Sequence, residues 1–210
     1  MSLPKERRQQ MINMMYLVLT AMLAMNITRE VLAAFQTINS SIESSNTSIT
    51  DKNQLFYDQF DAKEAKNDAD YALVKQLNDN AKEIRSKSDE IVKYLEGFKE
   101  EVVNTSGGWE TSESGVKSPK EMENIDAATR IFVEGKKGDE IRKRLEEFYA
   151  FILSKVDNES KREAMKKQFD GTFGTVVKSD ENPKGEWTYG TFHNIPVVAA
   201  MAMMSKFQND

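Results

Sequence analysis

The stretch VKQLNDNAKEIRSKSDEIVKYLEGFKEEVV, residues 74–103, decides the fold class. Apolar or small side chains recur in it at alternating steps of three and four residues, and mostly charged or polar residues fill the other positions. The series consists of Val74, Leu77, Ala81, Ile84, Ser88, Ile91, Leu95, Phe98 and Val102. This period is that of an amphipathic α-helix with one buried face. It predicts a helix from about Asp68 to Asn104, ended by TSGG.

Shorter segments on both sides have the same helical period. They are DKNQLFYDQF (residues 51–60), GDEIRKRLEEFYAFILSKV (138–156), NESKREAMKKQFD (158–170) and PVVAAMAMMSKFQND (196–210). Thr50 or Asp51 is the predicted cap of the first and Asn158 that of the third, while Pro196 opens the last. We therefore predict an all-α fold, a bundle of four to six helices. No capping glycine or other signal ends the last predicted helix before residue 210, so we expect the protein to continue beyond that residue.

Two breaks rich in Gly, Ser and Thr separate these segments, at residues 105–119 and 171–187. The first is predicted to be a loop, and the second has room for a short hairpin. The strand signal is weak and is confined to RIFVEG (130–135) and GTVVKS (174–179). Either of these segments could equally be a helix end or a loop.

The N-terminal segment predicts a membrane helix. No charged residue occurs from Met11 to Ile27, a run of roughly 25 Å in a helix against a hydrocarbon core of ~30 Å. The apolar pattern resumes beyond Arg29 and Glu30, so a single transmembrane helix is predicted over residues 9–35. The basic tail, residues 1–8, predicts a cytoplasmic N-terminus. Residues 36–210 would then form a first periplasmic helical domain.

A cleaved signal peptide is the alternative for this segment, since it also begins with basic residues followed by an apolar run. The run is longer than usual for a signal peptide, however, and no clear small-x-small cleavage site closes it. A stripe with alternating steps of four and three residues continues beyond it, at Val31, Phe35, Ile38, Ile42, Ser45 and Ile49. We interpret Val31, Phe35, Ile38 and Ile42 as the stalk of a homodimer. The simpler interpretation, a helix packed on its own domain, remains open.

A polar stripe lies within the apolar run. Asn13, Tyr16 and Thr20 are spaced i, i+3 and i+7, so they share one side of a helix. Polar side chains in lipid favour a protein partner, because an unpaired amide in hydrocarbon is costly. A helix enclosed by other helices fits this stripe, and so does a homodimer seam joined by Asn13.

The composition argues against an enzyme. The chain has no cysteine and one histidine, His193, which excludes thiol catalysis, zinc thiolates and multi-histidine metal sites. No phosphate-binding loop or hydrolase motif is present. The net charge is −5 and no basic face stands out, so nucleic acid is not an expected partner. We predict no catalytic site, no cofactor and no metal.

RRQQMINMMYLVLTAMLAMNITREVLAAF, residues 7–35, closely resembles the opening of the GldM/PorM family, usually P-R-Q-K-M-I-N-L-M-Y-L-V. The shared residues are Met11 to Asn13, Met15 to Val18, Ala24 to Asn26 and Glu30 to Leu32. The end of the chain, with Trp187, Phe192, Pro196 and Gln208, looks like the end of that family's first periplasmic domain. The dense resemblance covers about a quarter of the chain.

This resemblance implies an inner-membrane motor of type IX secretion and gliding motility. Two copies would place their single transmembrane helices inside a ring of about five GldL-like subunits, an expectation that rests on the family analogy. Proton flow would drive rotation, and domains beyond this fragment would relay it to an outer-membrane ring of GldK- and GldN-like proteins.

The resemblance also implies a coupling residue. An arginine at the start of the family's helix faces an acidic residue of the partner ring, and an ungapped match places that arginine at Arg8. The local sequence KERRQQ departs from P-R-Q-K, so Arg7 is a rival. Two alternatives to the motor remain: a passive single-span scaffold or sensor dimerised by a helical stalk, and a soluble periplasmic binding domain after signal cleavage.

Overall fold

The computed structural model describes residues 7–25, 29–66, 70–113, 115–174, 176 and 178–210. Within them the protein is mostly helical, which confirms the predicted helical fold. The elements are α1 (Arg7–Met25), α2 (Arg29–Glu64), α3 (Tyr71–Thr105), β1 (Trp109–Thr111), β2 (Lys117–Pro119), α4 (Asp126–Ala128), the π-helix η1 (Thr129–Glu134), α5 (Lys137–Ser154), α6 (Glu159–Phe173), α7 (Trp187–Phe192) and α8 (Val197–Asn209). The described residues thus hold more helices than the predicted four to six, and the additional ones include the short α4, of 3 residues, and η1 and α7, of 6 residues each.

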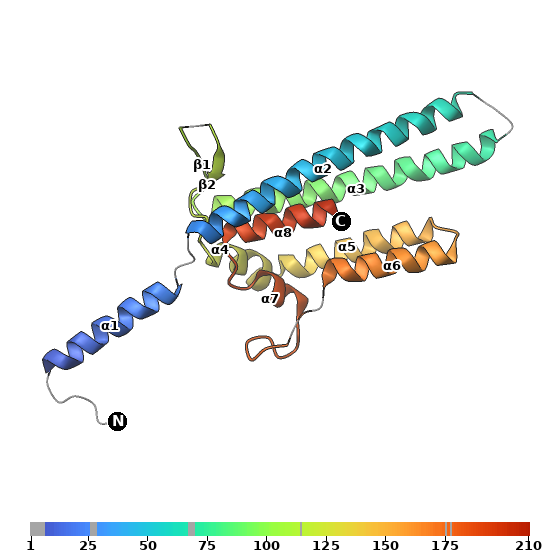
Figure 1. The fold of residues 1–210 in the computed structure, drawn as a ribbon. Helices are drawn as coiled ribbons and strands as arrows, with labels where there is room; N and C mark the ends of the chain where they lie inside the picture. Colours follow the sequence, from blue (N-terminus) through green and yellow to red (C-terminus); the bar gives the residue numbers. More distant parts are fainter. Residues whose placement is uncertain (1–6, 26–28, 67–69, 114, 175, 177) are drawn as a thin grey trace.

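The helices form two hairpins with α8 between them (Figure 1). The long pair α2 and α3 runs antiparallel, and the shorter pair α5 and α6 lies beside it. Helix α8 packs against both α2 and α3 along its length. Helix α1 extends away from this bundle.

Helix α2 is longer than predicted. Residues 51–60 were expected to be a separate helix capped by Thr50 or Asp51, and this is wrong, because α2 continues without a break from Arg29 to Glu64. The Thr50 hydroxyl donates to the Asn46 carbonyl within the helix, at 3.0 Å, instead of capping a new one. The cap predicted at Asn158 is confirmed, since its Oδ1 accepts a hydrogen bond from the Lys161 amide at the start of α6.

The two strands that the structure describes lie outside both strand candidates of the sequence. RIFVEG lies mostly in η1, a buried turn of π-helix, whereas the first Gly- and Ser-rich break forms an antiparallel hairpin in which Trp109 pairs with Pro119. A loop was expected there. The candidate strand GTVVKS includes residues 175 and 177, which lie outside the described residues.

An aromatic-rich core joins the two hairpins. The predicted buried face of α3 is confirmed at Leu95, Phe98 and Val102, which are at most 6% exposed. Phe132 of η1 is fully buried between Phe98 and Phe192, with ring centroids 5.5 and 4.3 Å away. Further buried residues of this core are Val103, Ile141, Leu145, Trp187, Met204 and Phe207. This core holds α3, α5, α7 and α8 together.

The predicted membrane helix over residues 9–35 corresponds to α1 and the first turns of α2. Helix α1 is described to Met25 and α2 from Arg29, so the predicted continuity through residues 26–28 lies outside the described residues. Among the helices as described, none combines the length and the apolar character needed to cross a membrane.

Candidate functional site

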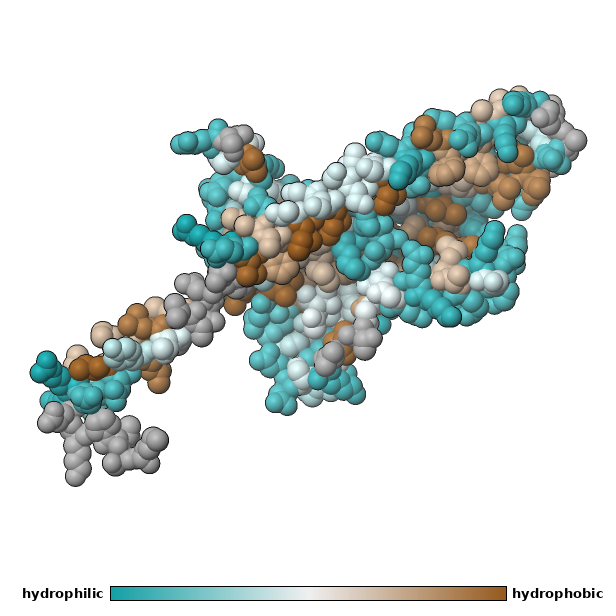
Figure 2. Space-filling view, viewed as in Figure 1, coloured by the Kyte–Doolittle hydropathy of each residue, from teal (hydrophilic) through white to brown (hydrophobic). Residues whose placement is uncertain are grey.

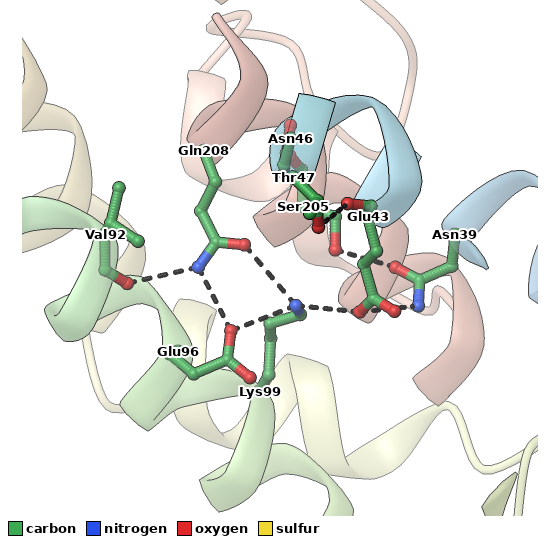
Figure 3. Close-up of polar contacts among 9 residues, drawn as sticks. All are labelled: Asn39, Glu43, Asn46, Thr47, Val92, Glu96, Lys99, Ser205 and Gln208. Atoms are coloured by element: carbon green, nitrogen blue, oxygen red, sulfur yellow. Dashed lines mark hydrogen bonds and ion pairs between the residues drawn. The ribbon is translucent and has the colours of Figure 1, made fainter. Parts of the chain in front are cut away.

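A buried lysine lies where α2, α3 and α8 meet (Figure 3). The Lys99 side chain on α3 is 5% exposed, and its ammonium nitrogen has three acceptors. Nζ lies 3.0 Å from Glu43 Oε1 on α2, 3.0 Å from Glu96 Oε2 on α3 and 3.4 Å from Gln208 Oε1 on α8. An ammonium group has three N–H donors, so each has a partner. Burying a charge is costly unless it is paired in this way.

The position of Lys99 follows from the pattern of α3. It comes directly after Phe98, at the edge of the apolar face, so its methylene stem packs beside the core while its charged end reaches the α2 side. Glu43 and Glu96 remain about half exposed, with 46% and 54% of their side-chain surface accessible. The ion pairs therefore join a buried cation to two carboxylates that are still partly hydrated.

Gln208 closes the α8 side of this cluster. Its Nε2 donates to the Val92 carbonyl and to Glu96 Oε2, both at 3.1 Å, while its Oε1 accepts from Lys99. Partial burial would raise the pKa of Glu96, but the hydrogen bonds from Gln208 and Lys99 outweigh it and hold that pKa below its ordinary value. Glu96 is therefore ionised at neutral pH and complements the charge of Lys99.

A polar seam continues from this cluster along α2 and α8. The Ser205 hydroxyl donates to Asn39 Oδ1 at 2.7 Å, and Asn46 Nδ2 donates to the Ser205 carbonyl at 3.1 Å. Asn209 Nδ2 donates to Asn46 Oδ1 at 2.7 Å and to Ser45 Oγ at 3.2 Å. Asn39 Nδ2 in turn donates to Glu43 Oε1, which links the seam to Lys99. We call Asn39, Ser45, Asn46, Ser205 and Asn209 the α2–α8 seam.

The predicted dimer stripe lies beside this seam. Val31 and Ile38 are 45% and 49% exposed, whereas Phe35 and Ile42 are partly buried. The two residues of α2 that the described structure buries are Leu32 and Asn39, each one position after a stripe residue. Helix α2 thus packs on its own domain, as the simpler interpretation had it, and still leaves much of the stripe exposed. A dimer on that stripe remains a prediction.

The predicted coupling residues lie together at the start of α1. Arg7 and Arg8 are exposed in its first turn, and Asn13, Tyr16 and Thr20 are exposed further along. The Thr20 hydroxyl donates to the carbonyls of Tyr16 and Leu17, at 2.8 and 3.1 Å, so its donor is satisfied within the helix. The predicted need for a protein partner therefore rests on Asn13 and Tyr16 of the polar stripe.

The apolar side chains of α1 are also uncovered. Met11, Met14 and Leu17 are 68–73% exposed, which Figure 2 shows as brown and tan surface on the extended helix. Exposed apolar surface of this extent indicates contact with lipid or with another protein. The arginines, the apolar surface and the polar stripe thus occur on one helix outside the bundle.

The α2–α3–α8 cluster was not predicted. Its members are far apart in sequence, since Lys99 is 56 positions from Glu43 and 109 positions from Gln208. One signal was available: residues 39–48, NSSIESSNTS, place Asn, Ser and Thr inside a helix. Such side chains either bond back to their own helix, as Ser41, Thr47 and Ser48 do, or reach a neighbouring helix, as Asn39 and Asn46 do.

In the part of the chain that the structure describes, no group of three or more His, Asp or Glu side chains is placed to hold a metal ion. No curated protein matches the chain. The family model described as the GldM N-terminal domain matches residues 30–210.

Proposed function

Since this match covers most of the chain, the protein belongs to the GldM family, and on that premise we propose that it serves gliding motility and type IX secretion as the transmission subunit of a proton-driven motor. In this proposal it has no enzymatic activity. The observation that carries it is the exposed α1, with two arginines in its first turn and a polar stripe along an apolar helix. A cleaved signal peptide would account for the arginines and the apolar run, but it would not need the polar stripe.

Helix α1 enters the inner membrane in this proposal, with its N-terminus in the cytoplasm and the helical bundle in the periplasm. The proposed span is longer than α1 alone and extends over the uncharged run to Ile27 and on to Phe35. Two such helices sit inside a ring of GldL-like subunits. A carboxylate of the ring pairs with Arg8, or with its rival Arg7, and protonation of that carboxylate releases the pair.

The chain acts as a homodimer in this proposal. The stripe of Val31, Phe35, Ile38 and Ile42 supports it, because α2 packs on its own domain through a neighbouring face and leaves Val31 and Ile38 about half exposed. Domains beyond this fragment carry the movement to the outer-membrane ring of GldK- and GldN-like proteins. The alternative is a passive scaffold or sensor dimerised by the same stripe, which would tolerate Asn13→Leu and Arg8→Ala.

Cysteine cross-linking tests the dimer, and the chain itself contains no cysteine. Ile38→Cys is expected to give a disulfide-linked dimer under mild oxidation in the native membrane, because equivalent stripe positions meet across a two-fold axis. Ser40→Cys is the matched control, since it is also exposed but lies about 200° around the helix. Cross-linking that is equal at both positions, or stronger at Ser40, would contradict the α2 dimer.

A further inference from the structure

Helix α2 has 36 residues but buries few of its side chains against the domain. Among its described residues only Leu32 and Asn39 are buried, while its contacts with α8 include the hydrogen bonds of the α2–α8 seam. The core that holds α3, α5, α7 and α8 together is aromatic and apolar. The attachment of α2 therefore depends on directional polar contacts much more than on apolar burial.

Among these contacts, loss of the Glu43–Lys99 pair is expected to cost the most, because Lys99 is buried. The Lys99 ammonium is fixed by its burial and by Glu96 of its own helix, whereas Glu43 reaches it from α2. Rotating α2 by one residue position, about 100°, would carry the Glu43 carboxylate away from Nζ. The buried cation would then lose one of its two anionic partners, which strongly disfavours the rotated arrangement.

Buried polar pairs can set the register of packed helices, because apolar contacts are far more tolerant of sliding. The seam adds to this effect, since Ser205 contacts both Asn39 and Asn46 and so spans two turns of α2. The two sets of contacts together specify a single rotational position of α2 on α8.

We propose that Glu43 and Lys99 form a coupling latch that fixes α2 on α3 and α8, so that movement entering through α1 is transmitted to the whole domain. This rests on the proposed motor function, because it supposes that α1 moves. Lys99 and Glu43 are positioning residues in this sense, acting through the attachment of α2. Without the latch, the α2–α8 seam alone holds α2, so α2 turns or slides on α8 more easily and the domain follows its movement less closely.

The test compares Glu43→Gln with Glu96→Gln in the full chain within its native complex. Both carboxylates accept a hydrogen bond from the same ammonium at 3.0 Å, and both are about half exposed. Only the first substitution removes the charge from a contact between α2 and the rest, because a glutamine at position 43 can still accept a hydrogen bond but no longer forms an ion pair. We expect Glu43→Gln to slow secretion by at least about tenfold and Glu96→Gln by no more than about threefold, with normal assembly in both.

A rescue experiment separates coupling from folding stability. Ser45→Cys with Asn209→Cys places a disulfide between α2 and α8, at side chains that already touch. In the Glu43→Gln background it should restore secretion, and a reducing agent should abolish the rescue. The control disulfide, Asp139→Cys with Thr188→Cys, joins α5 to α7 at another pair in hydrogen-bond contact and leaves α2 unbridged. It should raise the melting temperature without restoring secretion.

The possible outcomes distinguish the latch from the motor. Arg8→Ala and Arg7→Ala show whether secretion depends on an arginine of α1. If it does, and Glu43→Gln still secretes normally, the latch is overturned and the motor is left intact. Equal rescue by both disulfides would also overturn the latch, since the loss would then be one of stability. Normal secretion by the variant lacking both arginines would overturn the motor and the latch together.

Discussion

Replacing Arg8 by alanine is expected to reduce type IX secretion and gliding to background while the complex still assembles. An ionised carboxylate within a membrane protein ring is costly, and a nearby guanidinium offsets that cost. Arginine remains charged at all physiological pH values and can form a two-pronged contact with a carboxylate. In the proposed motor, replacing Arg8 removes the charge that pairs with the ring carboxylate, so proton flow would no longer be coupled to movement. The measurement is the amount of secreted cargo in the medium, beside co-purification of the partner subunits.

Arg7→Ala is the matched control, because Arg7 lies in the same exposed first turn of α1. Arg7→Ala should retain most of its secretion if Arg8 is the coupling residue. The reverse result would transfer the role to Arg7. Arg8→Lys should retain only part of the activity, since a lysine keeps the charge but cannot form the bidentate hydrogen bonds of a guanidinium with a carboxylate. Undiminished secretion in the variant lacking both arginines would rule out the motor function.

Phe132→Ala is expected to cause the largest loss of folding stability, about 3–5 kcal/mol. Phe132 is completely buried, and its ring contacts Phe98 of α3 and Phe192 of α7. Truncation would leave a cavity at the point where η1, α3 and α7 meet, and the aromatic contacts on both sides would be lost. Thermal and urea unfolding of the full chain in detergent, followed by circular dichroism, measures the loss.

Phe56→Ala is the control for this prediction, because Phe56 belongs to α2 and is 60% exposed. Its replacement should change the free energy of unfolding by about 0.5 kcal/mol or less. Similar losses for the two variants would show that the core does not lie where η1 meets α3 and α7.

The sequence predicted the helices well where one apolar face is buried continuously. Helix α3 was expected from about Asp68 to Asn104 and is found from Tyr71 to Thr105, with Leu95, Phe98 and Val102 in the core. The same series places Leu77 on the buried face, yet it is 46% exposed. Only part of the long α2–α3 hairpin is accompanied by α8, so its far end has less to pack against (Figure 1).

The errors have local physical causes. Thr50 and Asp51 are good N-caps in isolation, and within α2 the Thr50 hydroxyl instead bonds back to the Asn46 carbonyl. For RIFVEG a strand, a helix end and a loop were all left open, and Ile131 and Phe132 are buried in a π-helix, where tertiary packing decides among these possibilities.

The two parts of the candidate site differed in what the sequence could predict. The arginines and the polar stripe of α1 lie within one short segment, so spacing and family resemblance were enough to propose them as candidates. The cluster around Lys99 depends on α2, α3 and α8 meeting, and no local pattern connects Glu43 to Lys99 or Gln208. The α2–α8 seam likewise depends on the packing of α8 against α2, which the sequence alone does not show.

Native mass spectrometry of the chain co-expressed with a GldL-like protein and purified in detergent is the most direct test of the proposed enclosed helix. We expect a complex with two copies of this chain, each with an intact N-terminus, and a larger number of GldL-like subunits. A dimer of this chain without the partner, or a chain cleaved between residues 25 and 35, would contradict the enclosed motor helix.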